Sequence, residues 1–448
     1  MNILHYTIGL PPIRRGGSVQ YAFDLMQEQS KSHNAFALTC GDTLFRSNKA
    51  KIKANGSDGK IKVFILTNPL TPTLIYGTSE PDKQHRNIQI DQENIRNFIQ
   101  TNNIEVMHLH TLQGIHKSFV EFVKSLGVKI IYTTHDFHGI CPHYNLINQT
   151  GELCKASDGK MCAICNQNEP SDLFLRIANS KLYHLIKETG VLKLIKRPST
   201  TKVAISNEPQ YSISACNVNG FEQLLEYYKN YFALVDIFHF NSQQTRNIFQ
   251  CFIPFADGKT IPVVTSGIKD NRAPRKIKDT IKFGYIGSLN DYKGFPLLKK
   301  VLSKLYNQGL SKFKLLAYAG TYQYSDPDCP FIEYQPPYKY SEISKILYNI
   351  DCIIVPSKWY ETFSLVTLEA LSHGIPVIVS DHVGAKDIVR QYGQQYVFSN
   401  YNQLINILFD IISKPELLEK YNRLILNKDW DFSIEKHSEE IIKMYNSI

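Results

Sequence analysis

The chain has 448 residues, of which 43% are hydrophobic and 20% are charged, and its formal net charge is +9. One hydrophobic core rarely serves a chain of this length, so the sequence predicts two or three domains of ordinary globular composition. No run of about 18 apolar residues is present, which excludes a typical membrane-spanning helix. The N-terminal residues MNILHYTIGL lack the basic region and cleavage site of a signal peptide, and we expect a cytoplasmic protein.

The first half of the chain alternates apolar runs with helical patterns, such as the one over residues 19–31. This alternation is typical of βαβ units in a parallel sheet. Strands are expected over residues 2–9, 36–40, 61–67, 106–110, 129–136, 202–206, 237–242 and 261–267.

The second half repeats this organisation after a polar, charged stretch over residues 269–279, which predicts a linker. A helical pattern over residues 295–307 follows the first of the new apolar runs. Two doubly wound α/β domains are therefore predicted, and ligands of such sheets bind beyond the carboxyl ends of the strands. Strands are expected over residues 281–289, 313–320, 331–335, 352–357, 376–381 and 395–399.

Three short motifs stand where expected strands end. Gly16 and Gly17 open a helix and allow a ligand close to the backbone, although a plain tight turn is the alternative. His135 can exchange hydrogen bonds with a sugar hydroxyl and be oriented by Asp136, although a structural histidine is the alternative. Lys293 is a compact charge that suits a diphosphate, although a solvated surface lysine is the alternative.

Two glutamates, Glu361 and Glu369, flank a segment whose leucines recur at helical spacing, and a helix is expected over residues 362–373. A helical interval places their backbones about 12 Å apart, more than the roughly 5–9.5 Å between the paired carboxylates of glycosidases. We therefore expect them to hold separate parts of one ligand. The N–H groups of residues 363–365 would form a phosphate site between them. A salt-bridged surface helix is the alternative.

Taken in order, these motifs resemble those of the retaining glycosyltransferases of group 1, or family 4, which have the GT-B fold. The most specific part is the E-x7-E pair with the run EALSHGIPVIVSDHVGAKDIV. The resemblance covers nearly the whole chain and implies two Rossmann-like domains facing across a cleft. It implies an acceptor domain over residues 1–270 with an insertion at about 138–200, a donor domain over 271–429, and a terminal helix over 430–448 that crosses back.

The resemblance also implies roles for individual residues, with His135, Glu361 and Lys293 as the catalytic ones. Glu361 would contact the donor sugar, and His135 would lie beside that sugar at the reaction centre. Lys293 and the amides of residues 362–365 would hold the diphosphate, and Glu369 would hold the ribose. The implied donor-binding residues are Gly16, Gly17, Ser288, Lys293, Thr362, Phe363, Ser364, Leu365 and Glu369.

Three positions depart from the pattern of the family. Ser288 stands where many members have arginine, Ser364 replaces a common glycine, and Ala385 replaces the second glycine of a pair. These departures predict either weaker phosphate binding or a compensating basic residue elsewhere.

The reaction implied is retaining transfer from a UDP- or GDP-linked sugar to a glycan or lipid-linked acceptor, as in polysaccharide, capsule or O-antigen biosynthesis. No cofactor is expected for catalysis, because Lys293 and the helix end would stabilise the leaving diphosphate. A GT-B nucleotide-sugar epimerase and a non-catalytic nucleotide-sugar-binding protein are the alternatives. Nucleic-acid binding is not expected, because the basic residues are not gathered into an aromatic-interleaved face.

A cysteine cluster follows His135, and its members are Cys141, Cys154, Cys162 and Cys165. Four thiolates that end in C-x-x-C match a tetrahedral structural zinc site, and cysteines are normally reduced in the cytoplasm. An iron–sulfur cluster, unligated thiols and a redox pair are the alternatives.

The segment over residues 172–197 has six basic and two acidic residues interleaved with leucine and isoleucine. Such a segment is expected to lie on an anionic membrane surface, at the inner face of the membrane, where a lipid-linked acceptor would be found. A helical insertion packed on the first domain is the alternative.

Overall fold

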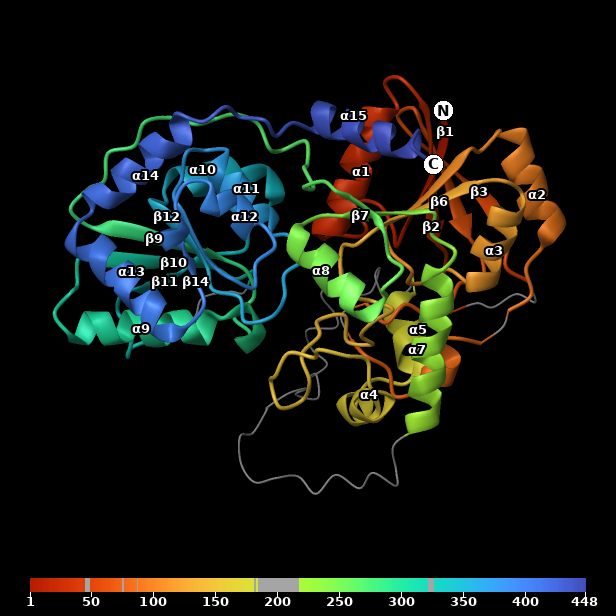
Figure 1. Cartoon of the computed structure of the whole chain (residues 1–448), viewed down its shortest axis with the longest axis horizontal. Coiled ribbons are helices and arrows are strands. Elements are labelled where there is room, and N and C mark those ends of the chain that lie inside the picture. The colour runs from red at the N-terminus through yellow and green to blue at the C-terminus, as the bar shows by residue number, and fades with distance from the viewer. Residues whose placement is uncertain (45–48, 75, 87, 181–182, 184–216, 321–325) are drawn as a thin grey trace. The chain divides into compact units, whose positions relative to one another are not determined.

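The structure is a computed structural model of the chain, and it describes residues 1–44, 49–74, 76–86, 88–180, 183, 217–320 and 326–448 (Figure 1). Two compact units are present. The first consists of residues 1–239, 249–259 and 444–448, and the second of residues 240–248 and 260–443. The predicted division between residues 270 and 271 thus falls within the second unit.

The first sheet has eight strands in the order β3-β4-β2-β1-β5-β6-β7-β8. The strands from β4 to β7 pair in parallel along this order, and β3 pairs with β4 in the antiparallel direction. The strands are β1 (Asn2–Thr7), β2 (Asn34–Cys40), β3 (Ile52–Asp58), β4 (Ile61–Leu66), β5 (Val106–Leu109), β6 (Lys129–Thr133), β7 (Ile237–Phe240) and β8 (Gly258–Thr260).

The second sheet has six parallel strands in the order β11-β10-β9-β12-β13-β14. The strands are β9 (Ile281–Ile286), β10 (Phe313–Tyr318), β11 (Ile332–Tyr334), β12 (Cys352–Val355), β13 (Val377–Ser380) and β14 (Val397–Phe398).

The described helices come mainly between successive strands (Figure 1). The α-helices are α1 (Gly17–Gln29), α2 (Gln92–Thr101), α3 (Lys117–Ser125), α4 (Gly159–Asn166), α5 (Asp172–Asn179), α7 (Val218–Phe232), α8 (Gln243–Phe252), α9 (Phe295–Asn307), α10 (Ile343–Tyr348), α11 (Leu365–Leu371), α12 (Lys386–Arg390), α13 (Tyr401–Ser413), α14 (Glu416–Leu426) and α15 (Ile434–Tyr445). The short 3-10 helices are η1 (Pro81–Lys83), η4 (Asp291–Lys293), η5 (Tyr340–Glu342) and η6 (Gln394–Tyr396).

Both sheets have the doubly wound strand order that was predicted. In each unit the first strand lies inside the sheet, the next parallel strands extend on one side of it, and the later strands extend on the other. The direction of winding reverses between β1 and β5 in the first sheet and between β9 and β12 in the second. Ligands of such sheets bind at this switch point, beyond the carboxyl ends of the strands. The prediction of two Rossmann-like domains is confirmed.

Helix α9 shows how the sequence pattern builds the core of the second unit. Its residues Phe295, Leu298, Val301, Leu302 and Leu305 recur every three or four positions and are all buried. They pack into one cluster with the apolar side chains of the central strands. The helix matches the segment expected from the sequence, because a regular apolar face leaves little choice of register.

One expectation about strands was wrong, and one strand of the structure was not expected. Residues 261–267 do not form a strand; the short β8 precedes them, and the Ile261 N–H donates to the carbonyl of Phe240 before the chain leaves the sheet. Strand β3 was not expected, because Ile52 is its only buried residue and the pattern lacks alternation. The strand expected over residues 202–206 lies outside the described residues.

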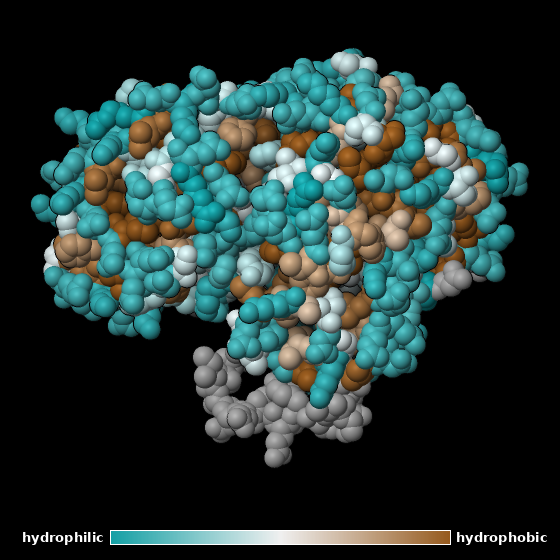
Figure 2. Space-filling model, viewed as in Figure 1, coloured by the Kyte–Doolittle hydropathy of each residue, from teal (hydrophilic) through white to brown (hydrophobic). Residues whose placement is uncertain are grey.

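Helix α5 is the start of the segment expected to contact a membrane. On α5 the side chains of Leu173, Phe174 and Ile177 are exposed. The rest of that segment lies almost entirely outside the described residues, and membrane contact stays a prediction. Figure 2 shows hydrophilic residues over much of the displayed face with hydrophobic ones between them. None of the helices in the described ranges is both long enough and apolar enough to span a bilayer.

Candidate active site

The second unit brings Lys293 and Glu361 together at its switch point. Lys293 ends η4, which follows β9, and Glu361 follows β12. The Lys293 Nζ donates to Oε1 of Glu361 at 2.8 Å. The strands β9 and β12 are neighbours in the sheet, so two residues far apart in the sequence meet at one edge. Ser357 also donates its hydroxyl to Oε1 of Glu361.

The carboxyl group of Glu361 is buried, yet it is held in its charged form. Burial alone would raise its pKa, but the charge and hydrogen bond of Lys293 act in the opposite direction. The hydrogen bond from Ser357 and the nearby indole of Trp359 add to this effect, and the resulting pKa lies below the usual value of 4.5. Glu361 is thus an ionised acceptor beside a cation at neutral pH.

Trp359 is a site residue that was not predicted from the sequence. Its ring centroid lies 4.8 Å from the Lys293 ammonium, which is within cation–π distance, and its ring also meets the edge of Tyr292. Trp359 therefore orients the cation that pairs with Glu361. The available signal was its position between a buried strand and the first glutamate of the E-x7-E pair.

The loop from Glu361 to Leu365 is fixed through its carbonyl groups. The hydroxyls of Ser242 and Thr245 both donate to the carbonyl of Thr362, at 2.6 and 2.8 Å. The N–H of Ala385 donates to the carbonyl of Phe363. Within the described part of the chain, the N–H groups of residues 363–365 have no hydrogen-bond acceptor. The loop thus presents backbone donors while its carbonyls are occupied.

The helix expected over residues 362–373 is shorter in the structure. Helix α11 begins at Leu365, because Ser364 has a φ of +100°, outside the helical region. Glycine adopts this conformation without the steric cost that a Cβ brings, so Ser364 has backbone strain that a glycine would avoid. The helix ends in a turn at Gly374, whose φ is +72°.

Glu369 lies on α11 and has partners different from those of Glu361. Its Oε1 accepts a hydrogen bond from the Tyr340 hydroxyl at 2.8 Å, and the Thr265 hydroxyl lies 3.1 Å from the same tyrosine oxygen. Burial raises the pKa of Glu369 to about 7, against the opposing effect of the bond from Tyr340. The two glutamates do not act as a pair in this geometry.

The raised pKa of Glu369 predicts a pH-dependent stability. Its folded-state pKa of about 7 exceeds the unfolded value of 4.5. The contribution of Glu369 to the free energy of unfolding is therefore complete below pH 4.5 and is lost as pH rises through 7. The shift corresponds to about 3 kcal/mol. Urea unfolding from pH 4.5 to 8 should show this loss in the parent protein relative to Glu369→Gln. The exposed Glu435→Gln is the control, and parallel curves for the parent and Glu369→Gln would contradict the prediction.

The remaining donor-binding candidates divide between the units. Gly16 precedes α1 with a φ of +143°, and a Cβ there would have no atom within 4 Å, so the position has open space beside it. Gly17 is the first residue of α1. Ser288 follows β9 and accepts a hydrogen bond from the Tyr285 hydroxyl at its carbonyl, at 2.5 Å. These placements are compatible with the predicted roles, which stay predictions.

His135 belongs to the first unit and lies just beyond β6. Its Nε2 is 3.4 Å from Nδ1 of His110, which lies just beyond β5. The carboxylate of Asp136 accepts the backbone N–H of His138, and burial raises its pKa to about 6. The histidine on the neighbouring strand, which was not singled out in the sequence, is thus a ring partner of His135.

The four cysteines lie near one another in the first unit and form no disulfide. Burial, with the nearby sulfurs of the cluster, raises the pKa of Cys141 to about 12 and of Cys154 to about 11. Burial, and then the sulfurs of Cys141 and Cys165, also raise the pKa of Cys162. Among the described residues, no three of these sulfurs lie within 4.8 Å of one another. A zinc ion would have to draw them closer, and its presence stays a prediction.

Comparison with known proteins extends these observations. The model of the family described as Glycosyl transferases group 1 matches residues 268–428. Spore coat protein SA of Bacillus subtilis (strain 168) is 26% identical over 121 residues, which cover 26% of this chain and 31% of that protein. The chain thus spans less than a third of the length of this curated relative.

Solved structures resemble the whole chain at low sequence identity. Sucrose-phosphate synthase from Thermosynechococcus elongatus has a TM-score of 0.56 and 13% identity, with 100% of this chain and 98% of that chain covered. Anabaena HepE in complex with UDP and glucose has a TM-score of 0.55 and 12% identity, with both chains fully covered. The catalytic domain of Starch Synthase IV from Arabidopsis thaliana, bound to ADP and acarbose, has a TM-score of 0.56 and 12% identity, with 100% of this chain and 99% of that chain covered. These similarities show a GT-B fold with two Rossmann-like domains.

Proposed function

We propose that this chain, whose residues 268–428 match the model of the glycosyl transferases of group 1, moves a sugar from a nucleotide diphosphate sugar to a glycan or lipid-linked acceptor with retention of configuration. The observation that carries the proposal is the Lys293–Glu361 pair at the switch point of the matched domain. A cation and an ionised carboxylate at this edge suit a ligand that combines phosphates with sugar hydroxyls.

In the proposed reaction each group of the site has a separate task. Glu361 accepts a hydrogen bond from a hydroxyl of the donor sugar, while Lys293 and the N–H groups of residues 363–365 bind the diphosphate. Negative charge grows on the diphosphate as the glycosidic bond breaks, so donors fixed in advance lower the barrier. Glu369 binds the ribose. His135 lies beside the sugar, and the leaving diphosphate takes the proton of the attacking hydroxyl.

UDP-linked donors are the first choice for testing the proposal. UDP and glucose are present in the HepE complex, which shares the fold. Thermal unfolding with UDP, GDP, ADP and their common sugar conjugates would identify the base, because a ligand that binds the folded state raises its stability. Incubation of the identified donor with candidate acceptors should then give a product with the anomeric configuration of the donor. A C2 epimer formed without acceptor would instead indicate an epimerase, and no shift with any nucleotide would overturn the proposal.

Replacing each glutamate in turn should show which end of the donor it binds. Glu369→Ala is expected to weaken binding of the free nucleoside diphosphate about tenfold, the value of one hydrogen bond to a charged group. Glu361→Ala should mainly weaken binding of the intact nucleotide sugar. Calorimetric titration of both variants with both ligands is the measurement. Equal effects on both ligands would contradict the assigned roles.

We further propose that the four cysteines hold a structural zinc ion. Purified protein should contain about one zinc per chain, since four thiolates complete the usual tetrahedral shell. Replacing Cys162 and Cys165 with serine should remove the metal and destabilise the first unit. Cys251→Ser is the matched control, because Cys251 is exposed and separate from the cluster. Stable parent protein without metal, measured by elemental analysis, would refute the prediction.

A further inference from the structure

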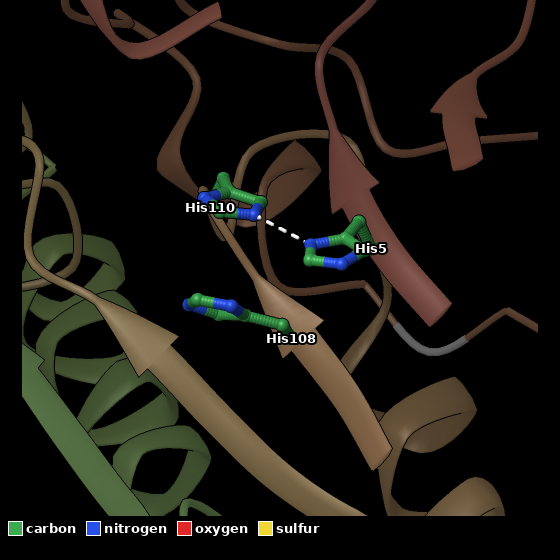
Figure 3. A group of neighbouring side chains, drawn as sticks. All are labelled: His5, His108 and His110. Atoms are coloured by element: carbon green, nitrogen blue, oxygen red, sulfur yellow. Dashed lines mark hydrogen bonds between the residues drawn. The ribbon is translucent and has the colours of Figure 1, made fainter. Parts of the chain in front are cut away.

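Five histidines of the first unit belong to one buried network that begins at Gln29. In the proposed function only His135 has a task, so the others require their own explanation. His5 and His108 are register partners on β1 and β5, and Figure 3 shows their rings beside that of His110. The network consists of His5, His108, His110, His135 and His239.

The first branch of the network starts with the side-chain amide of Gln29, the last residue of α1. Its Oε1 lies 2.8 Å from Nε2 of His5. A carbonyl oxygen only accepts, so His5 has its proton on Nε2. Burial lowers the pKa of His5 to about 4, which keeps the ring neutral and leaves Nδ1 as an acceptor. Nε2 of His110 lies 3.0 Å from this nitrogen and must be the donor (Figure 3).

The same logic continues from His110 to His135. Burial, with the neighbouring histidines, lowers the pKa of His110 far below its usual value, so this ring also has one proton. Its proton is on Nε2, which makes its Nδ1 the acceptor for Nε2 of His135 at 3.4 Å. Burial lowers the pKa of His135 to about 3. His135 is therefore neutral, with its proton on Nε2 and a lone pair on Nδ1.

The second branch starts from the amide nitrogen of the same glutamine. Nε2 of Gln29 donates to the Tyr445 hydroxyl at 3.5 Å, and that hydroxyl lies 2.6 Å from Nδ1 of His108. Nε2 of His108 is 2.6 Å from the Thr133 hydroxyl, which is 2.9 Å from Nδ1 of His239. Protons thus point toward Gln29 along the first branch, whereas in the second branch the amide nitrogen of Gln29 donates to the Tyr445 hydroxyl. The hydroxyls of Tyr445 and Thr133 can each donate or accept, so the amide sets the directions of the first branch only.

A metal site is the other explanation for three of these rings. His5, His108 and His110 each have a nitrogen within 4.8 Å of the others. However, both nitrogens of His5 and both of His108 already have partners in the protein. A hydrogen-bonded network accounts for these contacts without moving any ring.

We propose that Gln29 is a positioning residue that holds His135 in its Nε2–H tautomer, so that Nδ1 is the nitrogen that accepts a hydrogen bond from a sugar hydroxyl. The encounter with a sugar depends on the proposed function. The tautomer does not, and it can be measured in protein without substrate. Gln29 is buried and acts only through His5 and His110.

Nitrogen NMR of protein labelled on its histidine rings tests the tautomer, since protonated and lone-pair nitrogens give well-separated signals. His135 is assigned by loss of its signals in His135→Asn. We expect an Nε2–H tautomer in the parent protein and a mixture of tautomers in Gln29→Leu. Gln29→Glu keeps an oxygen acceptor toward His5 and should retain the parent signals of His135. Gln27→Leu, on the same helix, is the control.

The kinetic readout is a lower kcat with little change in KM for the donor. We expect a loss of about tenfold in Gln29→Leu, the value of about one hydrogen bond, and recovery in Gln29→Glu. An Nδ1–H tautomer in the parent protein, an unchanged tautomer in Gln29→Leu, or a stoichiometric metal whose removal alters the signals of His5 and His110 would overturn the inference. If the tautomer behaves as expected in protein that transfers no sugar, only the proposed function fails.

Discussion

Replacing Lys293 with methionine should lower kcat/KM for sugar transfer by about 10²- to 10³-fold, the usual cost of removing one fixed donor from a site of growing negative charge. Methionine keeps a stem of similar length and removes the ammonium group that lies 2.8 Å from Glu361. Because residue 288 is a serine and supplies no charge, less cationic support should remain for the diphosphate. The measurement is steady-state transfer from the donor identified by thermal unfolding.

The same substitution should change the stability and its pH dependence. The pKa of Glu361 is lowered in the parent protein, so its contribution is present above the unfolded pKa of 4.5 and is lost as pH falls through the folded value. Without Lys293, burial dominates and raises that pKa. Since Lys293 is partly exposed, we expect a loss of only about 1–2 kcal/mol at pH 7.

A matched control distinguishes a role in the site from loss of any surface charge. Lys358 pairs with Asp291 at 2.6 Å, and both side chains are well exposed. Lys358→Met removes the same charge from the neighbourhood of Lys293 and should change activity less than threefold, as exposed pairs contribute little. If Lys293→Met and Lys358→Met have equal activities, Lys293 does not support the leaving diphosphate.

The sequence allowed prediction of most elements of both sheets, because buried parallel strands and amphipathic helices have distinct apolar periods. It did not allow prediction that the Lys293 ammonium bonds to Glu361. These residues are joined by the adjacency of β9 and β12, which depends on how the chain crosses the sheet and not on any local pattern. Trp359 was missed for the same reason, since its significance comes from the lysine beneath its ring.

The histidine network illustrates a second limit of the sequence. His5, His108 and His239 each stand alone in an apolar strand, where a single histidine usually fills space and satisfies a local bond. Parallel register places His5 beside His108, and no spacing along the chain predicts that contact. His135 could be selected from its place at a strand end, whereas its partner His110 emerged only from the order of the strands.

Gly384→Ala is expected to disable donor binding by displacing the loop that contains Glu361. A Cβ at this position would lie 2.1 Å from the carbonyl oxygen of Thr362 and 2.6 Å from the Ser242 hydroxyl. Both atoms belong to the hydrogen bond that fixes the loop, so neither can move without losing it. The Gly384 N–H also donates to the carbonyl of Glu361 at 2.9 Å. One added methyl group therefore acts on three contacts.

We expect this variant to lose about 2–3 kcal/mol of unfolding free energy, in the range of overpacked buried sites, and to show no thermal shift with the nucleotide sugar. Gly393→Ala is the control, because the atoms nearest to its added Cβ belong to the flexible side chain of Gln395, which can swing aside. A Gly384→Ala protein that binds donor normally would show that the loop is not held as its hydrogen bonds indicate. Loss of binding with stability retained would instead localise the damage to the amides of residues 363–365, which the displaced loop would aim away from the diphosphate.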